Sequence, residues 1–144
     1  MNMSEIRTVF DLMRVLGNRL AGRSCVIRMQ EPATTNSYGT MQVRPDGVPE
    51  IHISPGLGPQ TIKTFLHELA HVRLHYKQIK PSHIHTAAPR TVTVRKEAKR
   101  PIWESQADAL RDEWLAYGKR HADPTLPDEE GILWALLDYY KEQN

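Results

Sequence analysis

Two histidines four residues apart are the feature of this chain best suited to chemistry. Residues 67–71 read HELAH, which has the H-E-x-x-H pattern. Residues at this spacing lie on one helix face, so His67 and His71 are expected to bind one metal ion. Glu68 is turned about 100° around the helix from His67, which predicts a general base beside a metal-activated water. The alternative is a pair of solvated histidines.

A catalytic zinc site needs three protein ligands and one open position, so a third ligand is expected elsewhere. Glu104 and Asp108 are four residues apart, next to the apolar stripe of a later predicted helix. Glu104 is predicted to complete a His2Glu set. Asp108 is predicted to accept the Nδ1 proton of one motif histidine, which leaves Nε2 for zinc. The alternatives are a solvated helix face and, for Asp108, a salt bridge to Arg111 or Arg73.

A further hydrogen-bond donor usually stabilises the oxyanion formed during peptide hydrolysis. The sequence offers four candidates for this role without selecting one: Tyr76, Tyr117, His75 and His83. His75 is about 12 Å from His67 along a helix, which disfavours it as a ligand to the same ion. His83 and His85 fall in a predicted loop, where solvated histidines are the usual outcome.

The elements that must position these residues are predicted from apolar periodicity and from turn residues. We expect a helix from Ser4 to Gly22, strands at 25–29, 38–44 and 49–54, helices at 61–77 and 101–118, and a last helix capped by Asp128. Segment 77–100 is predicted to be a basic loop, with a short strand at 91–94. The predicted fold class is α+β, with four helices and a small three-stranded antiparallel or mixed sheet, in one domain spanning 1–144. We also expect strand 49–54 to be a sheet edge, either unoccupied or pairing with an extended substrate.

Composition restricts the partners and the compartment. The 144 residues carry a net charge of +2, which is too small to indicate a nucleic-acid or membrane partner. The basic segment 77–100 lacks the aromatic residues that stack on bases, so direct nucleic-acid binding is not expected. Cys25 is the only cysteine, and no signal peptide or membrane span is apparent, so a cytoplasmic protein is expected.

The two motifs together resemble those of a known family. HELAH is followed, 33 residues after His71, by E-x-x-A-D at 104–108. This order resembles the gluzincin metallopeptidases and is most similar to the ImmA/IrrE family of small bacterial and phage enzymes, over about residues 4–117. The resemblance implies a zincin-like fold, one Zn2+ held by His67, His71 and Glu104, and Glu68 as the catalytic base. Family members often continue E-x-x-A-x-x-F-A, whereas this chain continues with Asp108, Ala109 and Leu110.

The sequence therefore predicts a zinc-dependent endopeptidase. The resemblance implies that its substrate is a protein partner such as a transcriptional repressor or another regulator. The alternative hypothesis is a non-catalytic metal-binding module that acts in regulation or interaction. The first hypothesis requires loss of cleavage when Glu68 is replaced, and the second requires that no partner is cut.

Overall fold

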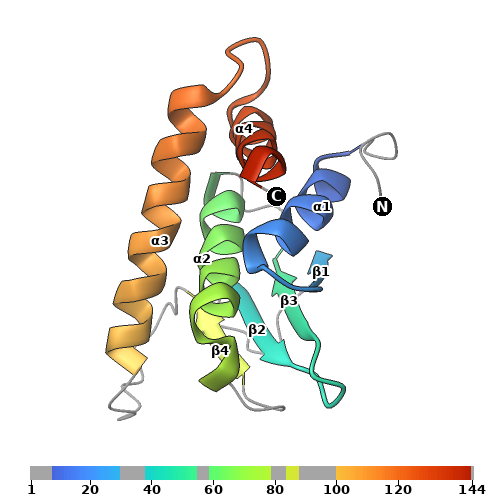
Figure 1. Cartoon of the computed structure of the whole chain (residues 1–144), viewed down its shortest axis with the longest axis vertical. Coiled ribbons are helices and arrows are strands. Elements are labelled where there is room, and N and C mark those ends of the chain that lie inside the picture. The colour runs from blue at the N-terminus through green and yellow to red at the C-terminus, as the bar shows by residue number, and fades with distance from the viewer. Residues whose placement is uncertain (1–7, 30–37, 55–58, 79–83, 88–99, 144) are drawn as a thin grey trace.

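The order of helices and strands largely follows the prediction. The computed structural model describes residues 8–29, 38–54, 59–78, 84–87 and 100–143. In chain order the elements are α1 (Val9–Ala21), β1 (Val26–Met29), β2 (Gly39–Val43), β3 (Pro49–Ile53), α2 (Pro59–His75), the 3-10 turn η2 (Tyr76–Gln78), β4 (Ile84–Ala87), α3 (Arg100–His121) and α4 (Asp128–Gln143). The α+β class and the mixed sheet are confirmed (Figure 1).

The strand order is β1-β3-β2-β4. β3 pairs with β1 in parallel and with β2 in antiparallel register, and the β2–β3 hairpin turns at Gly47, whose φ is +86°. The prediction that strand 49–54 lies at the sheet edge is therefore wrong, because both of its sides are paired. Which strands are neighbours depends on pairing between distant segments, and the alternation of apolar and polar residues within one strand does not predict it.

A fourth strand, β4, was not predicted. It lies inside the segment predicted to be a loop and pairs in antiparallel register with β2, so that His85 stands opposite Met41. Four residues among prolines and basic side chains give too short an alternation to indicate a strand. The predicted short strand at 91–94 lies outside the described residues.

Helix α1 begins and ends at capping residues. The hydroxyl of Thr8 accepts a hydrogen bond from the backbone N–H of Asp11 at 3.0 Å, so Thr8 is the N-cap and the prediction of Ser4 as the cap is wrong. Ser4 itself lies outside the described residues. Gly22 ends the helix with a φ of +74°, as predicted.

Helix α2 lies between α1 and α3, as Figure 1 shows, and packs its inner side on β2 and β3. The hydrophobic core is continuous across α1, the sheet, α2 and α4. Its fully buried members include Leu12, Leu16, Ile51, Ile53, Phe65, Leu69, Leu133 and Leu136. Because α2 contacts the sheet and two helices, the HELAH motif sits on a helix that is fixed on several sides.

Helix α3 continues past the glycine predicted to end it. It runs to His121, so the predicted end at Gly118 is wrong. A Cβ at Gly118 would lie 2.6 Å from Cγ2 of Ile132, on α4. Gly118 is therefore a point of close approach between the two helices and not a helix stop.

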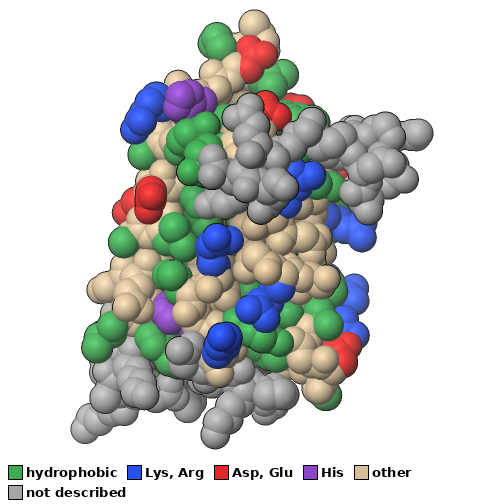
Figure 2. Space-filling model, in the orientation of Figure 1, with side chains coloured by type: hydrophobic (Ala, Val, Ile, Leu, Met, Phe, Trp, Pro, Cys, Tyr) green, Lys and Arg blue, Asp and Glu red, His purple; other side chains and the backbone are tan. Residues whose placement is uncertain are grey.

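No described helix is both long and apolar enough to cross a lipid bilayer. On the face shown in Figure 2, acidic and basic side chains are scattered among apolar and neutral ones instead of forming a patch of one sign. The basic segment 77–100 falls largely outside the described residues, which include only 77–78, 84–87 and 100 of it.

Candidate metal centre

The two motif histidines lie side by side on α2. Their ring centroids are 4.8 Å apart, and the ring planes are inclined by 79°. His71 has no exposed surface and His67 is 5% exposed. The spacing of four residues therefore does what the sequence predicted and places two imidazoles in one buried position.

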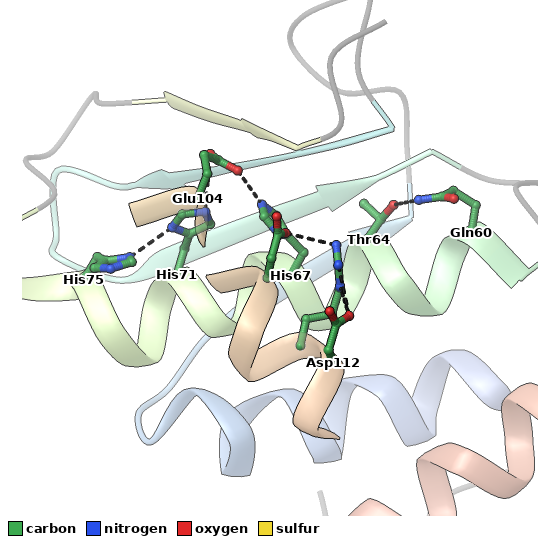
Figure 3. Close-up of polar contacts among 9 residues, drawn as sticks. Gln60, Thr64, His67, His71, His75, Glu104 and Asp112 are labelled. Atoms are coloured by element: carbon green, nitrogen blue, oxygen red, sulfur yellow. Dashed lines mark hydrogen bonds and ion pairs between the residues drawn. The ribbon is translucent and has the colours of Figure 1, made fainter. Parts of the chain in front are cut away.

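Glu104 reaches the same position from α3. Its Oε2 lies 3.1 Å from Nε2 of His67, and its Oε1 lies 3.5 Å from Nε2 of His71. Ligand atoms of the three residues all lie within 4.8 Å of one another. Tetrahedral zinc with bonds of 2.0–2.2 Å separates its ligand atoms by about 3.3–3.6 Å. The distances of 3.1 and 3.5 Å from the Glu104 carboxylate to the two imidazoles are close to this range, so the three side chains suit one ion. Figure 3 shows Glu104 facing the two imidazoles.

Asp108 contacts the other nitrogen of His67. Its Oδ1 lies 2.9 Å from Nδ1 of His67 and also 3.0 Å from NH1 of Arg111. The predicted contact with a motif histidine and the alternative salt bridge to Arg111 thus occur together. Arg73, the other alternative partner, donates instead to the carbonyl oxygen of Leu20.

The Asp108 contact determines which nitrogen of His67 is available. A neutral imidazole carries one proton, and a carboxylate 2.9 Å from Nδ1 favours its placement on that nitrogen. The lone pair of Nε2 then points at the Glu104 carboxylate. With the proton on Nδ1, two acceptors would face one another at 3.1 Å, an arrangement that a cation between them would stabilise. The donor set fits a divalent cation such as Zn2+, since two imidazoles and one carboxylate match its preferred ligands.

Glu68 is completely buried on the neighbouring side of α2. It stands one turn after Thr64, whose methyl group packs so close to β2 that a Cβ at Gly39 would lie 2.6 Å from it. Glu68 therefore lies on the side of α2 that faces β2, whereas His67 faces α3. The negative charge of Glu68 is also felt at Cys25, whose pKa is raised to about 12 by burial first and by Glu50 and Glu68 next. The role of Glu68 as a base stays a prediction.

The candidate oxyanion donors Tyr76 and Tyr117 have partners away from the cluster. Tyr76 donates its hydroxyl to the carbonyl oxygen of Gly47, and Tyr117 packs against the rings of His121 and Tyr139 far along α3. Neither contact brings the hydroxyl to the cluster, so the structure gives these two candidates no support as oxyanion donors. His75 is buried and has both ring nitrogens in contact with other side chains, so it does not fit this role either. His83 lies outside the described residues, and His85 is described only as a backbone position in β4.

Two neighbours of the cluster were missed by sequence reasoning. Gln106 has its Oε1 2.7 Å from Nε2 of His75, and Trp103 stacks on the His75 ring at a centroid distance of 5.1 Å. Trp103 is half-buried and packs against the hydrophobic core.

Comparison with known proteins gave no match: no family model matches the chain, and no curated protein or solved structure is significantly similar. The cluster of His67, His71 and Glu104 is therefore the feature of this chain that points to a function.

Proposed function

We propose that this chain is a zinc-dependent endopeptidase that hydrolyses a peptide bond in a protein partner. One observation carries the proposal: His67 and His71 of an H-E-x-x-H helix meet Glu104 of a second helix within 4.8 Å in a largely buried position. The motif resemblance to the ImmA/IrrE family supports the same function. Asp108, 2.9 Å from Nδ1 of His67, would add to it by keeping the His67 proton away from the cluster.

The residues around the cluster have distinct proposed roles. Zn2+, when bound by the two histidines and Glu104, would polarise a peptide carbonyl and lower the pKa of water to about 7. Glu68 would accept a proton from that water and pass it to the leaving amine.

We further propose that an extended segment of the substrate pairs with β4. Within the described sheet, β4 is the edge strand next to β2, and α2 contacts both strands. The sequence placed the pairing of the substrate at β3, but β3 is paired on both sides. We therefore place this pairing at β4, the edge strand that contacts the helix of the candidate histidine ligands. The partner we propose is a cytoplasmic protein, such as a transcriptional regulator.

The test compares the zinc-loaded parent with Glu68→Gln and with the control Glu113→Gln, which changes an exposed carboxylate on α3. Each protein is incubated with a proteome-derived peptide library, and new termini are identified by mass spectrometry. We expect cleavage by the parent and the control, and a rate about 10²- to 10⁴-fold lower for Glu68→Gln with zinc still bound. Full activity of Glu68→Gln would refute the assigned mechanism.

One observation favours a second function, a metal-binding module without catalysis. The motif histidines and Glu68 are at most 5% exposed, which limits the access of a peptide substrate to the cluster. This function requires that zinc raises the thermal stability of the parent while neither the library nor a candidate regulator is cut.

A further inference from the structure

The two motif histidines differ in what contacts their second nitrogen. For His67 that contact is the Asp108 carboxylate. For His71 it is another imidazole, because Nδ1 of His71 lies 3.0 Å from Nδ1 of His75 (Figure 3). A hydrogen bond between two ring nitrogens needs one protonated partner and one lone pair. The proton of this bond can therefore reside on either ring, and the direction must be decided elsewhere.

Gln106 decides the direction. The Nε2 atom of His75 lies 2.7 Å from Oε1 of Gln106, a carbonyl oxygen that only accepts hydrogen bonds. The proton of neutral His75 is therefore on Nε2, which leaves a lone pair on its Nδ1. That lone pair accepts from Nδ1–H of His71. The remaining nitrogen of His71, Nε2, then has a lone pair 3.5 Å from Oε1 of Glu104.

The His75 ring is held in the orientation that this chain of bonds requires. It is 3% exposed and lies nearly parallel to the indole of Trp103, with an interplanar angle of 18°. Trp103, Glu104 and Gln106 all belong to α3. One helix therefore supplies the candidate carboxylate ligand and also the two side chains that fix His75.

We propose that His75 and Gln106 are positioning residues that place the proton of His71 on Nδ1 and so make its Nε2 a metal ligand. The inference rests on the metal centre proposed above, but it does not depend on peptidase activity. It gives His75 a role that differs from those of metal ligand and oxyanion donor, since its two nitrogens contact His71 and Gln106.

The first measurement reads the proton directly, without metal. Long-range 15N–1H correlation spectra of the 15N-histidine-labelled apo protein distinguish the two neutral tautomers of each imidazole. We expect His71 protonated on Nδ1 and His75 on Nε2. We also expect Gln106→Glu to preserve this pattern, because a carboxylate keeps the acceptor, and Gln106→Lys to remove it.

The second measurement is zinc affinity by competition with a chelator. His75→Leu should weaken zinc binding by about 10- to 100-fold, the usual effect of losing the partner of a metal-bound histidine. His75→Gln, which retains an acceptor, should recover most of the loss. Gln106→Ala should weaken binding by about 3- to 10-fold, the effect of one hydrogen bond, and Gln106→Glu should bind like the parent. Ser105→Ala, at the adjacent exposed position, is the control.

The outcomes separate this inference from the proposed function. If the parent binds zinc but His71 is protonated on Nε2 in the apo protein, or if His75→Gln binds no better than His75→Leu, the positioning role is wrong and the metal centre stands. If the parent binds no zinc, the metal centre is wrong, and the positioning role is wrong with it. Because Gln106 is exposed, its variants test the inference even where a change at buried His75 disturbs folding.

Discussion

Replacing Glu104 with glutamine tests the candidate metal centre most directly, because it removes the only candidate ligand that carries a negative charge and changes the shape of the side chain very little. The contacts at 3.1 and 3.5 Å join this carboxylate to both imidazoles. A neutral amide is a poor zinc ligand, so the variant is expected to lose affinity for zinc while retaining its fold.

The expected shift in melting temperature follows from mass action and chain length. Zinc at 100 times its Kd stabilises the parent by about 2.7 kcal/mol. For 144 residues the entropy of unfolding is about 0.3 kcal/mol/K, so the parent melts about 9 °C higher with zinc. If Glu104→Gln weakens binding by about 100-fold, the same zinc concentration stabilises it by about 0.4 kcal/mol, or about 1 °C.

The assay is thermal unfolding followed by circular dichroism, with and without zinc, on the parent, Glu104→Gln and the control Glu113→Gln. The control removes one exposed carboxylate from the same helix and should shift like the parent. Metal content measured by elemental mass spectrometry gives the stoichiometry, which is expected to be one zinc per chain.

A different interpretation of the same contacts makes the opposite prediction. If Glu104 only forms an ion pair with a protonated His67, zinc leaves the melting temperature of the parent unchanged, and Glu104→Gln destabilises the metal-free protein. Equal zinc shifts in Glu104→Gln and the parent would also refute the assignment of Glu104 as a ligand.

Three further predictions concern residues around and beyond the cluster. Asp108→Ala should weaken zinc binding by about 10- to 100-fold, measured by chelator competition, because His67 loses the carboxylate that holds its Nδ1 proton. Glu50 is buried, which raises its pKa, but hydrogen bonds from Arg28 and Gln42 lower it more, to a net value below the ordinary 4.5. Glu50 therefore stabilises the fold above that pH, so Glu50→Gln should cost about 1–3 kcal/mol at pH 7 in urea unfolding, and the difference should disappear as the pH falls below 4.5. Gly118→Ala should destabilise the protein by about 1–3 kcal/mol in the same assay, because its methyl group would overlap Ile132 of α4; an unchanged midpoint would contradict this close packing.

The parts of the cluster that depend only on the geometry of a single helix could be predicted from the sequence. The placement of His67 and His71 on one face needs only the helical repeat, and the carboxylates of α3 follow from the spacing of Glu104 and Asp108. That α3 docks with these carboxylates toward the histidines is a tertiary fact. The motif resemblance supplied it, and periodicity alone did not.

The features that were missed depend on contacts between distant segments. β3 is a central strand because β1 pairs directly with it, although β2 comes between the two in the chain. Gly118 is required by the close approach of α4. The contact between His75 and Gln106 was missed for a different reason. A single glutamine on an exposed helix position has no pattern that distinguishes it from any other, so only the folded structure shows its partner.

The origin of the candidate ligands on two helices means that a bound cation would act as a cross-link. His71 and Glu104 are 33 residues apart in the chain, and closing a loop of that length costs on the order of 3 kcal/mol of chain entropy. Near Glu104 the side chains of Ser105 and Gln106 are exposed, and Ala107 is the small buried residue, whereas Trp114 and Leu115 bury apolar surface farther along α3. The first turns of α3 would therefore open locally far more often when the cation is removed, and amide hydrogen exchange there would report the supply of metal.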